Sequence, residues 1–217
     1  MAFDSGLAKV IGLTPEEAAL FRPLTSPGKV QEFVSSIPVN FEPGGDTCHS
    51  VRTALRRNEC HCIEGAFIAA CALMLHGDRP YLLDFQAAED DDHVLTLFKR
   101  GGCWGAISKS NSLWLRWRDP VYCSVRELAM SYFHEYVRHD EKSLRRISKP
   151  FDIAAYRPED WITNEADCWD MAHEIDTSPH VDLVPASQLR HLRRRDALEL
   201  QGALVKQFRP ARARKQL

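Results

Sequence analysis

The spacing of hydrophobic residues divides the chain into a largely helical first part, a short block of strands and a second helical part. In the segments expected to be helices, apolar side chains recur every three or four positions, as on one face of a helix. The predicted helices cover residues 15–21, 26–37, 50–57, 62–75, 125–139 and 161–175.

Several of these helices carry local start and stop signals. Thr14 and Ser124 each precede an apolar periodic segment and are followed three positions later by a glutamate, which is the capping-box pattern. The helix predicted at 62–75 ends before Gly77, a residue suited to the left-handed backbone that follows many helices. These signals support the predicted helix boundaries.

From residue 81 onward, apolar residues alternate with polar ones, which is the period of a strand. A glycine pair, Gly101-Gly102, marks a hairpin turn within this region. The predicted strands cover residues 81–87, 93–98 and 103–108, with a further strand expected at 113–117.

Together these elements predict an α+β fold, with the central helix 62–75 packed on an antiparallel sheet and further helices flanking it. Two later segments lack a clear pattern: residues 142–158 are expected to be irregular and 179–185 to be a connection. The predicted domain boundaries give an N-terminal helical extension (1–23), a core (24–151) and a helical C-terminal extension with a basic tail (152–217).

Composition fits one globular domain with a sizeable core, since 44% of the 217 residues are hydrophobic. The net charge of −2 argues against a general nucleic-acid binder, and we interpret the basic stretches 193–195 and 212–215 as solvated surface. No apolar run approaches the roughly 18 residues of a membrane span. The start of the chain, with Asp4, is not typical of a targeting peptide. We therefore expect a cytoplasmic protein.

The seven cysteines are an odd number in a chain too long for a disulfide scaffold, so we expect reduced thiols. Cys62 stands apart because the chain is polar up to this residue and then becomes an apolar helix. The start of a helix carries partial positive charge, which lowers the pKa of a thiol, and its free N–H groups can hold an oxyanion. Cys62 is therefore the candidate nucleophile, with an ordinary buried cysteine as the alternative.

His93 is the candidate base. It begins the second predicted strand and shares a face with Leu95 and Leu97. If that face packs on the central helix, the imidazole points at Cys62, which is the arrangement of a Cys–His nucleophile pair. The alternative is a histidine at the edge of the core.

A third group should hold the His93 ring in one tautomer. We prefer Asn111, because its amide oxygen can accept the ring N–H, while Ser108 is also within reach on the next strand. The acidic turn Asp90-Asp91-Asp92 offers rival acceptors, although such a turn is commonly just solvated. An acidic mouth of this kind would favour cationic substrates.

This order of elements resembles the transglutaminase-like superfamily, which is related to the papain-like cysteine proteases. The matching stretches are Cys62-Ile-Glu-Gly-Ala66, Asp92-His93-Val94 and Trp104-Gly-Ala-Ile-Ser-Lys-Ser-Asn111. The runs Leu24–Pro27 and Arg126–Phe133 resemble an uncharacterised bacterial branch of that superfamily. The resemblance covers residues 24–151 and implies a transglutaminase-like or papain-like α+β core with Cys62 as nucleophile and His93 as base.

One position departs from the pattern of the superfamily, which usually has an aspartate four residues after a tryptophan on the third strand. Ser108 occupies that position here. Either Asn111 takes the role, as an asparagine does in papain-like enzymes, or the triad is incomplete and the domain is a non-catalytic binding module or a weak enzyme. The second oxyanion donor is also open, with Asn40 and Asn58 as candidates.

A metal site is a less favoured alternative. Five soft ligands lie close in the sequence, but the paired C-x₂₋₄-C spacing of structural zinc sites is missing. Glu64 is interpreted as a first-turn carboxylate favoured by the helix dipole. The five ligands are Cys48, His49, Cys60, His61 and Cys62.

The function expected from the sequence is acyl transfer on a peptide or amide substrate through a thioester on Cys62. The acceptor is water in a peptidase or amidase and an amine in a transamidase, and no residue pattern chooses between them. No metal, dissociable cofactor or membrane is expected to take part, and the Cys–His chemistry does not require calcium.

Overall fold

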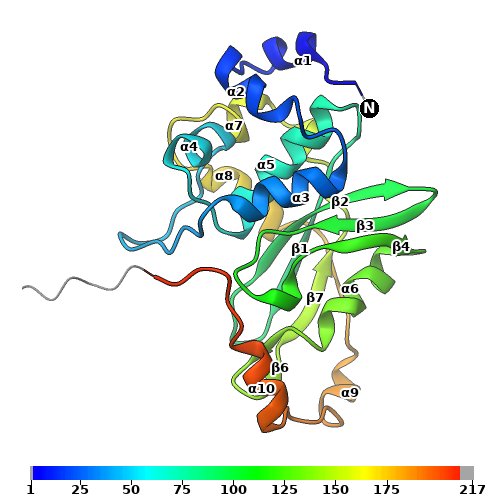
Figure 1. The fold of residues 1–217 in the computed structure, drawn as a ribbon. Helices are drawn as coiled ribbons and strands as arrows, with labels where there is room; N and C mark the ends of the chain where they lie inside the picture. The colour runs from blue at the N-terminus through cyan, green and yellow to red at the C-terminus, as the bar shows by residue number, and fades with distance from the viewer. Residues whose placement is uncertain (1, 211–217) are drawn as a thin grey trace, which may run out of the picture.

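The computed structural model describes residues 2–210 and has an α+β fold built around a six-stranded antiparallel sheet, in the order β4-β3-β2-β1-β7-β8 (Figure 1). A separate two-stranded sheet pairs β5 with β6. The strands are β1 (Tyr81–Ala87), β2 (His93–Arg100), β3 (Cys103–Ile107), β4 (Arg118–Tyr122), β5 (Val137–Arg138), β6 (Glu141–Lys142), β7 (Leu144–Ser148) and β8 (His180–Asp182).

Helices cover both faces of this sheet (Figure 1). Short 3₁₀ turns at Leu113–Leu115 and Ile153–Ala155 join some of the elements. The helices are α1 (Ser5–Val10), α2 (Pro15–Phe21), α3 (Pro27–Ser36), α4 (Val51–Arg57), α5 (Cys62–Leu75), α6 (Val125–Phe133), α7 (Pro158–Trp161), α8 (Trp169–Asp176), α9 (Ala186–Leu189) and α10 (Ala197–Ala203).

The central helix α5 is buried almost all round, between the sheet and a layer of shorter helices. Thr96 on β2 donates its hydroxyl to the carbonyl of Ala66 at 2.8 Å, which ties the helix to the sheet. Gly65 lets the end of β3 approach closely, because a Cβ there would lie 2.3 Å from the Cβ of Lys109. The predicted helix 62–75 and its packing on the sheet are confirmed.

The other face of the sheet packs against α6, and here one expectation is wrong. Leu95 and Leu97 belong to the cluster that includes α6, whereas Val94 and Phe98 on the opposite face belong to the cluster with α5. The face that His93 shares with the two leucines therefore does not pack on the central helix. His93 still meets Cys62, since it is the first residue of β2 and Cys62 is the first residue of α5, at the same end of the layer.

The capped helices and the three central strands match the prediction closely, but five later assignments are wrong. The predicted helix 125–139 ends at Phe133, and the predicted helix 161–175 begins only at Trp169, since Trp161 is the last residue of the short helix α7. The predicted strand 113–117 is a 3₁₀ turn followed by β4. The connection at 179–185 contains β8.

The largest error is β7, which lies inside the supposedly irregular segment 142–158. This strand pairs with β1 on one side and β8 on the other. Arg145 and Arg146 interrupt the alternation of apolar residues, and the exposed Arg146 reaches the carbonyl of His180 and the side chain of Gln86. A long charged side chain can extend into solvent while its backbone stays paired in the sheet. The two arginines therefore hid this strand from the apolar–polar pattern of the sequence.

Both predicted extensions pack against the core rather than standing apart. Ala8 and Ile11 from the N-terminal segment and Trp161 and Ile175 from the C-terminal one belong to the same buried cluster as α5. The segment after α10 also contacts the loop between β3 and β4, since Lys206 forms an isolated antiparallel bridge with Ser112. Residues 211–217, which include the basic stretch 212–215, lie outside the described residues.

Across residues 2–210, no single helix combines the length and apolar character needed to cross a membrane; α4 and α5 do so only together, as a pair bent by 110°.

Candidate active site

Cys62 is the first residue of α5 and its thiol is half-buried. Burial raises the pKa of this thiol, but hydrogen bonds to His61 and His93 and the charges of both rings lower it, and its pKa lies well below the ordinary value. Burial instead dominates for Cys60, whose pKa is raised to about 12, and for Cys48 and Cys71, whose pKa values are also raised. Among the shifted thiols, Cys62 alone is favoured as a thiolate.

His93 is buried, with 7% of its surface exposed, and its tautomer follows from its neighbours. Its Nε2 lies 2.7 Å from the hydroxyl oxygen of Ser108, and that oxygen lies 2.7 Å from the carbonyl oxygen of Leu115. A carbonyl can only accept, so the Ser108 hydroxyl donates to Leu115 and accepts from Nε2–H of His93. Nδ1 is then the nitrogen left for the thiol.

Ser108 is itself held by Gln31 of α3. The N–H of Ser108 donates to Oε1 of Gln31 at 2.9 Å, and Nε2 of Gln31 donates to the Ser108 carbonyl at 3.0 Å and to the Ser35 hydroxyl at 2.8 Å. All three residues are buried. The hydroxyl that orients His93 therefore has a fixed position.

Asn111, the preferred third residue, does not contact His93 in this arrangement. Its Oδ1 accepts the N–H of Phe208 at 2.8 Å and its Nδ2 donates to the Phe208 carbonyl at 3.1 Å. The amide is thus occupied by the C-terminal segment, and the structure brings Ser108 to the ring instead. The predicted contact between Asn111 and His93 is therefore replaced by one between Ser108 and His93.

The rival carboxylates of the acidic turn are also engaged elsewhere. The carboxylate of Asp92 accepts the N–H of Ala87 at 2.8 Å, and Asp90 binds the Ser143 hydroxyl and the N–H of Asp91. All three aspartates nevertheless line the cavity at Cys62. They contribute negative charge to the mouth of the site.

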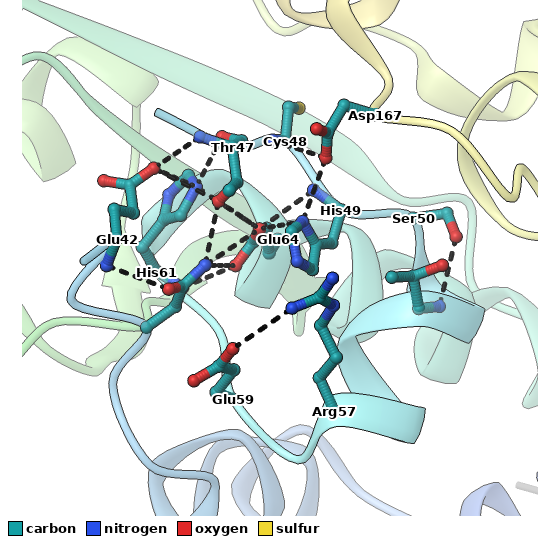
Figure 2. Close-up of polar contacts among 12 residues, drawn as sticks. Glu42, Thr47, Cys48, His49, Ser50, Arg57, Glu59, His61, Glu64 and Asp167 are labelled. Atoms are coloured by element: carbon teal, nitrogen blue, oxygen red, sulfur yellow. Dashed lines mark hydrogen bonds and ion pairs between the residues drawn. The ribbon is translucent and has the colours of Figure 1, made fainter. Parts of the chain in front are cut away.

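Glu64, two residues after Cys62, is fully buried beneath the start of the helix (Figure 2). Its carboxylate accepts the backbone N–H groups of His49 and His61, both at 2.9 Å, and lies 3.2 Å from the Thr47 hydroxyl and 3.4 Å from the amide of Asn40. This is the expected first-turn carboxylate, but it has many more partners than the helix dipole alone requires.

Two imidazoles also approach Glu64 (Figure 2). Nδ1 of His49 lies 3.2 Å and Nε2 of His61 lies 3.4 Å from Oε1 of Glu64, and Nδ1 of His49 is also 3.0 Å from Asp167. Nε2 of His49 is buried without a hydrogen-bond partner. The two histidines thus join the start of α5 to the loop that precedes α4 and, through Asp167, to the segment before α8.

A cavity of about 320 Å³ opens onto Cys62, His61 and His93. Its far wall includes the 111–115 loop and, from the end of the chain, Ala203 and Lys206. A neighbouring cavity of about 510 Å³ is larger but does not contain the reactive thiol or His93. The smaller cavity is therefore the candidate substrate site.

Neither residue suggested as the second oxyanion donor lines this cavity. The amide of Asn40 is bound to Thr47 and Glu64, and Asn58 is the left-handed C-cap of α4, with φ of 53°. The backbone N–H groups in the first turn of α5 lack acceptors within the helix, as at every helix start. They are the free backbone donors next to the thiol.

Within residues 2–210, the group with geometry for a shared cation is Asp84, Asp92 and Asp176, whose carboxylate oxygens lie within 4.8 Å of one another. The soft ligands considered for zinc do not form such a group in this part of the chain. His49 and His61 instead contact carboxylates.

The sequence pattern suggested His61 only as a zinc ligand, gave no role to Gln31 and favoured Asn111 over Ser108. A signal for His61 was present, because the residue before a helix-start cysteine is the N-cap and its side chain folds over the first turn. No local signal pointed to Gln31, which lies 77 positions from Ser108 along the chain. No protein-family model matches this chain, and no curated protein matches it.

Proposed function

We propose that this chain is a cysteine-dependent acyltransferase or hydrolase with a transglutaminase-like, papain-related core. The substrate is an amide or peptide carbonyl that enters the cavity at Cys62. The observation that carries the proposal is the ordered chain from the Leu115 carbonyl through Ser108 to His93, which leaves one imidazole nitrogen for the thiol. This chain keeps the proton on Nε2 of His93, so that Nδ1 is available to the thiol, as the base of a Cys–His pair requires.

In the first half of the reaction, the Cys62 thiolate attacks the substrate carbonyl carbon and the carbonyl oxygen becomes an oxyanion. First-turn N–H groups of α5 stabilise that charge. The imidazolium of His93 then donates its Nδ1 proton to the leaving nitrogen, the carbon–nitrogen bond breaks, and an amine departs. The acyl group remains on Cys62 as a thioester.

In the second half, neutral His93 takes a proton from water or from an acceptor amine, which attacks the thioester carbon. The second tetrahedral intermediate collapses and releases the thiolate together with an acid or a new amide. Ser108 takes no part in the bond changes. Its role is to keep Nε2 protonated and the ring oriented, which is the role of an aspartate or asparagine in comparable triads.

The site also fits a reducing compartment such as the cytoplasm. All seven cysteines are free, and a thiolate with a lowered pKa is oxidised more readily than an ordinary thiol. We include a cytoplasmic location in the proposal on this basis.

The test is site-resolved alkylation and acylation of the full chain, read by mass spectrometry. Iodoacetamide at about pH 6 should label Cys62 at least about tenfold faster than the exposed Cys123, because a free thiol is mostly protonated there. p-Nitrophenyl acetate should acetylate Cys62, and an added primary amine should divert the acetyl group from acetate to an amide if the enzyme is a transamidase. Cys62→Ala should abolish both signals, and His93→Ala should slow both.

If Cys62 reacts no faster than Cys123 and accepts no acetyl group, the proposal fails. The same fold would then be read as a non-catalytic binding module. A stoichiometric metal that protects Cys48, Cys60 and Cys62 together would instead support the zinc alternative.

A further inference from the structure

A second imidazole touches the nucleophile. His61 is the N-cap residue of α5, and its Nδ1 lies 3.9 Å from the Sγ of Cys62. Its side chain is 21% exposed and lines the same cavity as Cys62 and His93. Any carbonyl that reaches the thiolate therefore also meets the His61 ring.

The far nitrogen of this ring faces only acceptors. Nε2 of His61 lies 2.9 Å from the Thr47 carbonyl oxygen, 3.4 Å from Glu64 and 3.5 Å from Glu42. Because a carbonyl can only accept, Nε2 carries a proton. The two carboxylates favour a second proton on the ring, which Nδ1 then presents to the sulfur.

The charge balance around His61 supports the protonated ring. Burial lowers the pKa of His61. Four interactions raise it: the hydrogen bond to Cys62, the charges of Cys62 and Glu64, and the hydrogen bond to the Thr47 carbonyl. The resulting pKa is about 9. The groups that face the ring are Glu42 on the preceding loop, Cys62 and Glu64 on α5, and His93 of β2 across the thiol. At neutral pH the ring is an imidazolium.

The position of Nδ1 suits an oxyanion as well as a thiolate. In the tetrahedral intermediate the oxyanion is two bonds from Sγ, and an effective donor lies about 2.7–3.1 Å from that oxygen. A nitrogen 3.9 Å from the sulfur can meet this requirement without leaving its place over the first turn. The first-turn N–H groups approach from the helix, so the two kinds of donor are independent.

We propose that His61 is a catalytic residue, whose Nδ1–H stabilises the Cys62 thiolate in the resting protein and the oxyanion during acyl transfer. His61 keeps its proton throughout, while His93 moves the proton between thiol, leaving group and acceptor. Glu64 and the Thr47 carbonyl hold the ring in place. This inference rests on the proposed acyl-transfer function of Cys62.

The experiment compares two reactions of Cys62 that differ in the oxyanion. Alkylation by iodoacetamide displaces iodide at a saturated carbon and forms no oxyanion, whereas acylation by p-nitrophenyl acetate forms one. Both rates are measured on the full chain, at a pH where the thiol of each variant is fully ionised. His61→Ala should slow acylation on the order of 100-fold, the typical cost of one oxyanion donor, with little change in alkylation. His61→Asn, which keeps a neutral N–H donor, should recover part of the loss.

His49→Asn is the matched control, because His49 contacts the same buried Glu64 but donates nothing to the sulfur in the described contacts. It should leave the ratio of the acylation rate to the alkylation rate at the wild-type value. If His61→Ala lowers both rates by one factor, or leaves acylation unchanged, the inference is overturned. Failure of the proposed function is distinguishable, because wild-type Cys62 would then not be acylated at all.

The pH profile provides a second measurement that does not depend on the alanine variant folding. Acylation of wild type, followed as kcat/KM, should fall as pH rises through about 9, where His61 loses its proton. His61→Asn should lack this fall. A fall of the same size in both proteins would contradict the role of His61.

Discussion

Glu64 and Asp84 are two buried carboxylates in contrasting surroundings. Glu64 is fully buried and receives two backbone N–H groups, a hydroxyl, an amide and two imidazoles. Asp84, in the middle of β1, is 3% exposed and contacts one imidazole, that of His180 at 3.1 Å. Two more carboxylates, Asp92 and Asp176, lie beside Asp84.

The surroundings of Asp84 favour its protonated form. Burial raises the pKa of Asp84 to about 8, with further contributions from the charges of Asp92, Asp176 and Cys62. Nδ1 of His180 donates to the Ser178 carbonyl at 2.6 Å, which leaves Nε2 of the ring, at 3.1 Å, for the Asp84 carboxyl group.

The contrast arises from the type of element. Residues at and just before a helix start have N–H groups that no helix carbonyl binds, and Glu64 accepts two of them, from the N-cap residue His61 and from His49 before α4. The middle of a strand has its N–H and carbonyl groups occupied by the neighbouring strands or by fixed side chains, as the N–H of Asp84 is by Ser148. A buried carboxylate therefore obtains donors easily at a helix start and rarely within a sheet.

The largest expected effect is from Glu64→Gln. The substituted amide would face two backbone N–H groups that need acceptors and would leave the His61 ring without its buried countercharge, so we expect the unfolding free energy to fall by about 3–5 kcal/mol. Alkylation of Cys62 should slow as well, because the positive charge of His61 is weakened. Urea unfolding and iodoacetamide labelling measure the two effects.

Glu127→Gln is the matched control, since Glu127 holds the same third position in α6 and accepts the N–H of Cys123 at 2.7 Å, but is exposed. We expect its cost to be below about 1 kcal/mol. If the two variants lose the same unfolding free energy, burial does not increase the contribution of a first-turn carboxylate to stability.

The next largest effect is expected from Asp84→Asn, which should raise the unfolding free energy rather than lower it. A folded-state pKa of about 8 against the ordinary 3.8 means that the stabilisation from the Asp84 proton is complete below about pH 4 and is lost as pH rises towards 8. The asparagine cannot ionise, so the variant should gain stability relative to wild type as pH rises across that window. Denaturant unfolding at a series of pH values checks this.

Asp170→Asn, at an exposed position of α8, serves as the control and should show the wild-type pH dependence. A wild-type stability that does not fall between about pH 4 and 8 relative to Asp84→Asn would show that Asp84 is ionised in the folded protein. The two buried carboxylates would then be alike.

The smallest expected effects separate the two candidates for orienting His93. Ser108→Ala removes the acceptor of Nε2–H, and we expect acylation of Cys62 to slow on the order of tenfold with little loss of stability. Asn111→Ala removes two hydrogen bonds to Phe208, and we expect a loss of about 1 kcal/mol in stability with unchanged acylation per folded molecule. If instead Asn111→Ala slows acylation and Ser108→Ala does not, Asn111 is the residue that orients His93.

The sequence by itself determined those features that depend on a few neighbouring residues. Thr14, Ser50 and Ser124 cap their helices as the local pattern indicates, and Cys62 stands at the first position of α5. Caps and hydrophobic periods act over one turn or one strand, so their physics is complete within a short segment.

Tertiary structure alone decided which side chains meet. β7 enters the sheet despite its two arginines, and Ser108 reaches His93 because Gln31, distant in sequence, holds its backbone. Asn111 was the preferred acceptor on sequence grounds, but its amide binds Phe208 in the structure. Such choices depend on strand register and on competing partners far along the chain, which local periodicity cannot encode.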